Sequence, residues 1–476
     1  MVRVYFDWNV FSKLKKGIFT DISSFLEINS YILLMPFSQA HFQDLMKSYS
    51  PNNKLFFDDI KTLTKHCGKH LLAWDGEKTQ LYFCTPEEYL QSELENPNEN
   101  EFFDLENIFT EANHYLKDAG IVNSDTIIKG LYNSISAGIE ITNINKNALQ
   151  RIFPNLNSES SVWDLIKDIG PFVKNLTTDK LFYKGFRNSI KDSGSKLDMI
   201  SSSWGENEVM SNINEYLKQK GSNMTFIEII EYTFKARNEK PTNYEFFHSS
   251  YLMLDMLGYK KDKLKKPTDN MGNIQTDADH AFFAAHCDYF VVDDNNLRIK
   301  SKLLFKEFNI STTVLDPTEF VSTISNNIGN NNKQEDFILK SFSFCTKENL
   351  VHHQFHKEQN CEITSYKIPY FFLNCFNNAL YHNYKNENKI ILTLRKVFGN
   401  YNRYLFYTEV EYVFNIITSY FGISDESRKN ELREQYLHNH PFAGISWEFD
   451  FGYVMLNKDK DDGRPIVSIV YDKNCD

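Results

Sequence analysis

Two segments of this chain share one pattern, a short apolar run followed by an acidic residue and then by a helix. Residues 2–6 precede Asp7, and residues 289–292 precede Asp294. Runs of this length, rich in β-branched and aromatic residues and ended by a polar residue, are typical of buried strands in a parallel sheet. Because parallel strands are joined by crossover connections that are usually helices, the pattern predicts an α/β fold.

Two further strands are expected at residues 31–35 and 312–315. The helix after the first of these begins at Ser38 and carries His41 and Asp44 one turn apart, so both side chains lie on the same face. We therefore predict a parallel sheet flanked by helices, with strands drawn from distant parts of the chain.

The 476 residues are divided into four segments. Residues 1–60 and 243–325 are predicted to form one α/β domain, which a mainly helical insertion over residues 61–242 interrupts. An Asn- and Gly-rich run at 325–333 indicates a linker. Beyond it, residues 335–476 are predicted to form a C-terminal α+β accessory domain.

Local patterns place several elements inside these regions. In the insertion, Asp75-Gly76 predicts the turn of a hairpin, and Thr242 with Glu245 predicts a capped helix start. In the C-terminal region, residues 445–456 and 465–471 are expected to form two paired strands.

The composition restricts the class of protein and its compartment. Hydrophobic residues make up 41% of the chain and aromatic residues 15%, which excludes a disordered or collagen-like chain. No apolar run approaches the ~18 residues that a membrane helix needs, and Arg3 within the first apolar stretch argues against a signal peptide. Seven cysteines without a C-x-x-C motif favour reduced thiols, so we expect a cytoplasmic protein with no membrane attachment.

Four acidic residues stand where a predicted strand ends or the next helix begins: Asp7, Asp44, Asp277 and Asp294. Ligands of open α/β sheets bind at the carboxyl edge of the strands. Converging carboxylates repel one another unless a cation neutralises them, and hard oxygen ligands suit Mg²⁺ or Mn²⁺. Such an ion activates a water for phosphodiester hydrolysis. The alternative interpretation is four independent helix caps or surface acids.

Three segments resemble the signature regions of the PIN-domain nuclease superfamily. They are VYFDWNVFSKL (4–14), LLMPFSQAHFQDLMK (33–47) and TDADHAFFAAHCDYFVVDDNNLRIKSKLL (276–304). The third segment is similar to the D-x-x-H…D-x-F-(V/I)-T-x-D pattern of many PIN-like proteins, with Asp277, His280, Asp288 and Asp294 at the matching positions. The resemblance extends over residues 1–50 and 245–320.

The resemblance implies a PIN-like fold and a metal-dependent nuclease. The substrate implied is RNA or, less often in the family, single-stranded DNA, and a toxin or defence effector is one such role. The acidic quartet Asp7, Asp44, Asp277 and Asp294 would be both catalytic and metal-binding, holding Mg²⁺ or Mn²⁺. Supporting positions are Asn9, Ser38, His280 and Asp293.

The sequence departs from the family pattern in three respects. Val292 replaces the hydroxyl residue that often stands two positions before the last Asp, Asp44 is shorter than the usual Glu, and the insertion is much longer than in minimal members. Val292 and the acidic surface favour a second hypothesis, an inactive PIN-like scaffold that binds RNA or a protein partner.

The net charge of −11 excludes a strongly basic surface, so nucleic acid would need local basic patches. Basic runs lie within the matched segments. A run of this kind is either a solvated face or a track for phosphates, and we predict phosphate contacts here. The residues concerned are Lys13, Lys15, Lys16, Lys261, Lys263, Lys265, Arg298 and Lys300. Further partners expected are a regulatory protein or a second copy of the chain.

Overall fold

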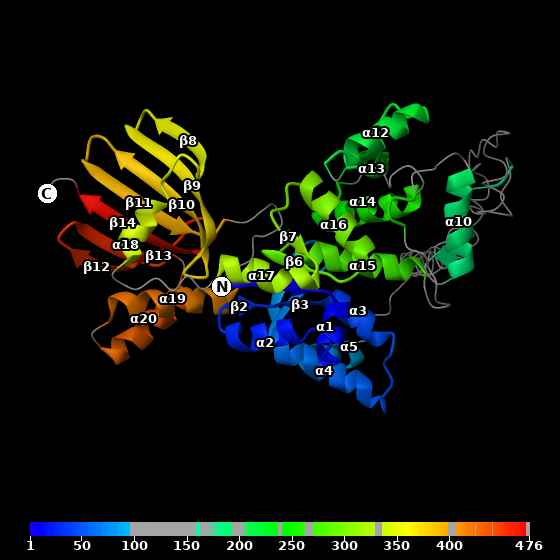
Figure 1. The fold of residues 1–476 in the computed structure, drawn as a ribbon, viewed down its shortest axis with the longest axis horizontal. Coiled ribbons are helices and arrows are strands. Elements are labelled where there is room, and N and C mark those ends of the chain that lie inside the picture. The colour runs from blue at the N-terminus through cyan, green and yellow to red at the C-terminus, as the bar shows by residue number, and fades with distance from the viewer. Residues whose placement is uncertain are drawn as a thin grey trace, which may run out of the picture. The chain divides into compact units, whose positions relative to one another are not determined.

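A computed structural model gives the fold of the chain (Figure 1). It describes residues 1–95, 159–161, 172, 175–176, 179–192, 204–205, 207–236, 240–261, 270–328, 336–397, 406–423, 425–439 and 441–472. Contacts divide the chain into two compact units. Unit 1 comprises Met1–Glu87, Phe283–Arg298 and Phe305–Asp476, and unit 2 comprises Glu88–Phe282 and Ile299–Leu304.

A four-stranded sheet lies in unit 1, in the order β2-β1-β6-β7, and every neighbouring pair is parallel. Its strands are β1 (Val2–Phe6), β2 (Leu33–Leu34), β6 (Tyr289–Val291) and β7 (Thr313–Leu315). The parallel sheet predicted from the sequence is confirmed, although β2 is shorter than expected. Because the chain runs from β1 to β2 on one side and later returns to β6 on the other, its winding direction reverses between β1 and β6.

Helices and a small second sheet complete this part of unit 1. The helices are α1 (Trp8–Lys15), α2 (Thr20–Asn29), α3 (Gln39–Met46), α4 (Lys54–Cys67) and α17 (Pro317–Asn327), and α16 (Asn295–Glu307) runs through both units. The small sheet joins β3 (Phe37–Ser38), β4 (His70–Trp74) and β5 (Thr79–Phe83). The antiparallel β4–β5 pair confirms the hairpin predicted around Asp75-Gly76.

Unit 2 is helical in its described residues. They form α10 (Lys180–Asp192), α12 (Val209–Gln219), α13 (Phe226–Ala236) and α14 (Asn243–Leu257), together with parts of α5 (Pro86–Glu95) and α15 (Met271–Ala284). The predicted capping box is present at α14, where the Thr242 hydroxyl accepts from the Glu245 N–H and the Glu245 carboxylate accepts from the Thr242 N–H. The α/β segment predicted over residues 243–325 is thus shared between the two units.

The C-terminal region of unit 1 contains a seven-stranded antiparallel sheet in the order β12-β13-β14-β11-β10-β9-β8. Its strands are β8 (Leu350–His356), β9 (Cys361–Phe372), β10 (Phe376–Tyr384), β11 (Lys389–Arg395), β12 (Ile445–Phe449), β13 (Gly452–Lys458) and β14 (Pro465–Asp472). Its helices are α18 (Phe337–Ser343), α19 (Tyr407–Phe421) and α20 (Glu426–His438). The predicted α+β character is confirmed.

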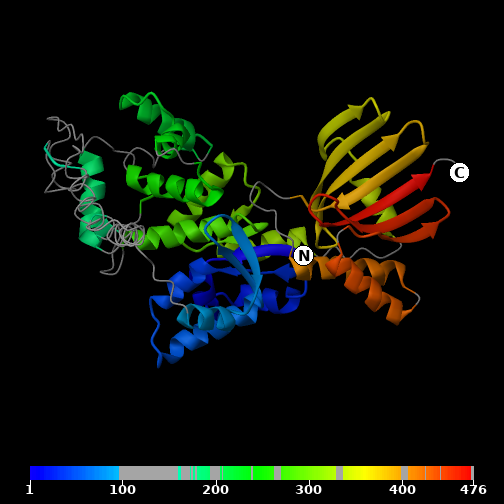
Figure 2. The same ribbon diagram turned by 180° about the vertical axis from the view of Figure 1, so that it is seen from behind.

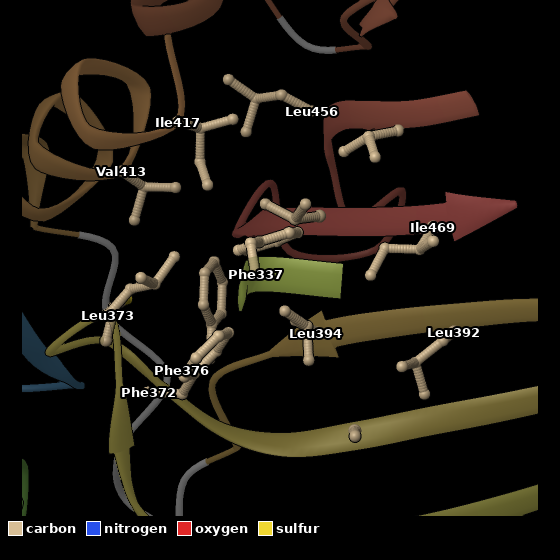
Figure 3. Close-up of a cluster of buried hydrophobic side chains, with 14 of the residues drawn as sticks. Phe337, Phe372, Leu373, Phe376, Leu392, Leu394, Val413, Ile417, Leu456 and Ile469 are labelled. Carbon is tan, nitrogen blue, oxygen red and sulfur yellow. The ribbon is translucent and has the colours of Figure 1, made fainter. Parts of the chain in front are cut away.

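One hydrophobic core joins these helices to the sheet (Figure 3). Phe337 from α18 and Val413 and Ile417 from α19 pack against Leu392 and Leu394 of β11. All five side chains are buried. Because the helices contribute to a single core, they cover one side of the sheet.

Three predictions in this part of the chain are corrected. The segment 445–456 is not one strand but the hairpin β12–β13, because Gly452 has φ +137° and lets the chain reverse. Strands β8 to β11 were not predicted. The expected linker at 325–333 begins inside α17, which continues to Asn327, and residues 329–333 lie outside the described part. None of the described helices combines the length and apolar character needed to cross a membrane.

Candidate functional site at the carboxyl edge of the parallel sheet

The carboxyl ends of β1 and β6 meet where the winding of the sheet reverses. Phe6 pairs with Val291, and the Asp7 N–H continues the ladder by donating to the Val291 carbonyl at 3.1 Å. Neighbouring strands are about 4.8 Å apart, so the residues that follow β1 and β6 share one crevice. In open α/β sheets this reversal point is where ligands bind.

Asp7 follows β1 directly and is 1% exposed. It is the N-cap of α1, and its Oδ1 accepts from the Val10 N–H at 2.9 Å. The local sequence explains this, because an aspartate before an apolar helical turn satisfies an otherwise unpaired N–H group. The backbone thus fixes the Asp7 carboxylate at the strand end.

Asp293 and Asp294 follow β6 at the same edge. Asp294 is exposed, and its Oδ1 accepts from the N–H groups of Asn296 and Leu297 at 2.7 and 2.9 Å in the first turn of α16. Asp293 forms an ion pair with Lys13 of α1 at 2.5 Å. This pair connects α1, which follows β1, to the chain after β6.

A buried polar group behind Asp7 holds the end of β1. The Ser38 N–H donates to His41 Nδ1 at 3.0 Å, and His41 Nε2 lies 2.8 Å from the Phe6 carbonyl oxygen. A carbonyl only accepts, so Nε2 carries the proton and Nδ1 is the acceptor. Tyr5 adds its hydroxyl, 2.6 Å from Ser38 Oγ. The sequence placed Ser38 at this site, but it did not indicate that Tyr5 and His41 fix it.

The remaining acidic and supporting residues of unit 1 lie on its helices. Asp44 is half-buried on α3 and forms an ion pair with Lys47 at 2.7 Å. Asn9 is exposed in the first turn of α1. Val292 is fully buried, as an apolar side chain after β6 would be. Asp316, which the sequence did not single out, follows β7 and caps α17.

Asp277 and His280 belong to unit 2, where both lie on α15. Asp277 is half-buried and His280 is 2% exposed. Their neighbour Asp279 is buried and accepts from the Tyr244 hydroxyl and from His248 Nε2, both at 2.7 Å. Burial and the Asp279 carboxylate raise the pKa of Tyr244 well above its usual range, so this phenol stays protonated.

Most predicted phosphate contacts that the structure describes have protein partners. Lys13 pairs with Asp293, Lys15 with Asp59 at 2.6 Å, and Arg298 with Asp316 at 2.6 Å. Lys16 is exposed after α1. Lys261 lies beyond the end of α14, whereas Lys263 and Lys265 lie outside the described residues.

The prediction for Lys300 is corrected. Its ammonium is fully buried, 3.7 Å from the Asp255 carboxylate and 4.4 Å from the centre of the Tyr251 ring. Asp255 also accepts from Arg187 at 2.8 Å. A phosphate contact requires an exposed ammonium, and Lys300 instead neutralises a buried carboxylate.

A buried charge cluster lies at the opposite, amino end of the same strands. Arg3 of β1 bonds Glu409 of α19 through Nε at 3.0 Å, and Lys396 bonds both Glu409 at 2.7 Å and Asp288 at 2.9 Å. Burial opposes ionisation of Glu409, but Arg3 and Lys396 outweigh it and hold the pKa of this carboxyl well below its usual range. Burial likewise opposes the Lys396 charge, yet Asp288 and Glu409 raise its pKa. The ion pairs of this cluster connect β1 and the residue before β6 to the C-terminal region.

Within the described ranges, no three His, Cys, Asp or Glu side chains are grouped so that they could hold a metal ion. The chemistry of the donors at the carboxyl edge nevertheless suits a hard cation, because Asp7, Asp293 and Asp294 offer carboxylate oxygens. Oδ1 of Asp294 binds the helix N-terminus, and no described residue bonds its other oxygen.

The chain has no match among protein-family models, curated proteins or solved structures. The resemblance to PIN-domain nucleases therefore rests on the three sequence segments, and membership of that superfamily is a proposal for this chain.

Proposed function

We propose that this protein is a metal-dependent nuclease of PIN-like fold that hydrolyses phosphodiester bonds in RNA in the cytoplasm. The observation that carries the proposal is the position of Asp7 and Asp294, which follow the two adjacent strands β1 and β6 where the sheet winding reverses. Two carboxylates at such a crevice are suited to an ion rather than to an uncharged ligand.

In this proposal Asp7 and Asp294 would contribute carboxylate oxygens to Mg²⁺ or Mn²⁺, and the sequence pattern adds Asp44 and Asp277 as candidates. A bound ion of this kind activates water and stabilises negative charge on the phosphodiester. The chain's own groups do the positioning. His41 holds the Phe6 carbonyl, Ser38 and Tyr5 support His41, and the Val10 N–H orients Asp7. Lys13 lies at the same edge, where its charge can meet a phosphate.

The test is cleavage of RNA and single-stranded DNA by the purified chain in Mn²⁺, with EDTA as the metal-free control. Asp294→Asn removes a ligand charge without changing volume, and asparagine caps a helix as well as aspartate does. We expect this variant to lose cleavage and to keep the melting temperature of the wild type.

Asp425→Asn is the matched control, because Asp425 also caps a helix, α20, but lies in the C-terminal region. It should cleave at the wild-type rate. Wild-type turnover by Asp294→Asn would remove Asp294 from the site. A wild type that cleaves nothing in Mn²⁺ would overturn the nuclease proposal.

A second candidate function is an inactive scaffold that binds RNA or a protein. The observations that favour it are the buried Val292, which offers no hydroxyl, and the cap bonds of Asp7 and Asp294. The two candidates differ in their response to Mn²⁺. Ion binding raises the melting temperature of the nuclease by mass action on the folded state, whereas a scaffold without an ion site melts identically in Mn²⁺ and EDTA.

A further inference from the structure

The C-terminal sheet has one covered side and one open side. Residues directly opposite one another on neighbouring strands point to the same side. Ala379, Leu392 and Leu394 point to the covered side, where every sheet residue of the described core cluster lies. The other side is named here the open face, and on β9, β10 and β11 it carries Lys367, His382, Tyr384, Lys389 and Arg395. Figures 1 and 2 view this sheet from opposite sides.

The open face is cationic over strands β8 to β11. None of its residues on these four strands, all of which are described, is Asp or Glu. Lys367, Lys389 and Arg395 form no ion pair with a carboxylate of the described residues, in contrast to Lys13, Lys15 and Arg298. In this chain of net charge −11, Lys367 is exposed on the open face and Lys389 and Arg395 are half-buried there.

Acidic residues occur only at the margin of this face. Asp472 on β14 lies opposite Lys389, and Asp459 and Asp462 in the β13–β14 turn act on Arg395 from a distance. The cations of the face, Lys367, Lys389 and Arg395, thus lie on β9 and β11, and His352 and His356 of β8 also point outward.

Flat rings stand among these cations. His382 and Tyr384 of β10 are stacked, with ring centres 6.1 Å apart and planes inclined by 25°. Arg395, opposite Asn378 farther along β10, is held by a hydrogen bond from its Nε to Asn378 Oδ1 at 2.8 Å. Rings for stacking and cations for phosphates, displayed together on an open sheet, are the means by which proteins bind single-stranded nucleic acid.

We propose that the open face of β8–β11 binds single-stranded RNA, with Lys367, Lys389 and Arg395 on phosphates and with His382 and Tyr384 stacked on bases. Tyr384 and Lys367 lie at positions of the sheet that are six residues apart, or about 20 Å along the strands, which gives room for several nucleotides along the strand direction. This inference deepens the proposed function, since the sheet would hold the RNA that the nuclease site cuts.

The first test is fluorescence anisotropy with labelled oligouridine in EDTA, so that binding is measured without cleavage. Lys367→Glu with Lys389→Glu should weaken binding about tenfold or more and should reduce the slope of log K against log salt by about 0.7 for each lost phosphate contact. Lys340→Glu with Lys429→Glu makes the same charge change on α18 and α20, which cover the other side, and should leave binding within about twofold of wild type.

The second test separates stacking from charge. Tyr384→Ala should weaken binding about five- to a hundredfold, whereas Tyr384→Phe keeps the ring and should bind as wild type does. Equal affinity of wild type, Tyr384→Ala and the Lys367/Lys389 double variant would overturn the inference, as would a wild type that binds no oligouridine. A wild type that binds a protein through this face but not RNA would overturn it too.

These experiments can reject the RNA-binding face and the nuclease proposal independently of each other. Asp294→Asn should bind oligouridine normally on the open face while cleaving nothing. If the sheet variants bind normally but the wild type cleaves, the nuclease proposal stands and the RNA-binding face is rejected. If the sheet variants lose binding and the wild type never cleaves, the face stands and the nuclease is rejected.

Discussion

At the scale of single residues, one helix shows how neighbouring lysines differ in role. Lys300 and Lys302 lie on α16 two positions apart, but Lys300 is fully buried beside Asp255 and Lys302 is exposed. In the sequence, both lysines belong to the third segment that resembles PIN-domain nucleases, residues 276–304. The distinction arises from Asp255, which lies on another helix and leaves no local mark in the sequence around Lys300.

We predict that Lys300→Gln lowers the free energy of unfolding by about 3 kcal/mol, because it leaves the buried Asp255 carboxylate with one cation fewer. Lys302→Gln is the matched control and should change it by less than about 0.5 kcal/mol. Urea denaturation measures both. Equal stability of the two variants would contradict the structural role of Lys300.

The group behind Asp7 supplies a second residue-scale prediction. Tyr5→Phe removes the hydroxyl that bonds Ser38 and should cost about 1 to 2 kcal/mol, because the Ser38 hydroxyl loses a buried partner. Tyr82→Phe, which alters an exposed tyrosine on β5, should be neutral. Thermal melting of both variants checks the difference, and a neutral Tyr5→Phe would count against the hydrogen bond.

At the scale of elements, the predictable parts were those whose pattern is local. Strands β1, β6 and β7 are apolar runs bounded by polar residues, and the carboxylates after β1 and β6 were found because such strands end on them. Strand β8 was missed because its sequence, LVHHQFH, does not alternate between apolar and polar residues. The hairpin β12–β13 was read as one strand because the reversal at Gly452 depends on a single backbone angle.

That glycine gives an element-scale prediction. A Cβ at Gly452 would lie 2.2 Å from the Val470 carbonyl oxygen, in addition to the strain of φ +137°. Gly452→Ala should therefore cost about 3 kcal/mol. Gly422→Ala shares a positive φ, +75°, with ψ 158°, but meets nothing within 4 Å, so it should show only the backbone strain, about 1 to 2 kcal/mol. The difference between the urea unfolding midpoints of the two variants measures the clash with the Val470 carbonyl. Equal midpoints would contradict this clash.

At the scale of the whole molecule, unit 1 is held together by charges that no local pattern reveals. Arg3, Asp288, Lys396 and Glu409 are close neighbours in the structure although they come from four distant positions in the sequence. The sequence indicated a separate C-terminal domain because a linker and the composition that follows it can be recognised from neighbouring residues alone. The contacts that join it to β1 and β6 depend on the complete fold.

The cluster predicts how stability changes with pH. The pKa of Glu409 is lower in the folded protein than in the unfolded chain, so its stabilisation is present above about pH 4.5 and is lost as the pH falls through the lower folded value. The Lys396 contribution has the opposite sense. The pKa of Lys396 is raised in the folded protein. The stabilisation by Lys396 is therefore present below about pH 10.5 and is lost as the pH rises through the folded pKa.

Glu409→Gln should cost about 3 to 5 kcal/mol near neutral pH, and its deficit against wild type should shrink as the solution is acidified. Glu411→Gln, on the same helix but in the partly exposed pair with Arg433, should cost less than about 1 kcal/mol throughout. Melting curves from neutral to acid pH record both. A deficit of Glu409→Gln that does not change with pH would exclude ionised Glu409 as its source.

The large sequence separation of these partners delays their contact while the protein is being synthesised. Arg3 cannot bond Asp288 or Glu409 until these residues have been synthesised, 285 and 406 residues later. Ribosomes add roughly 5 to 20 residues per second, so β1 spends on the order of 15 to 60 seconds without β6 and longer without Glu409. Asp7 cannot meet the chain after β6 during that interval. For the proposed nuclease, Asp7 would gain its counterpart only after Asp294, 287 residues later, has been translated, and a product truncated before β6 would carry Asp7 without it.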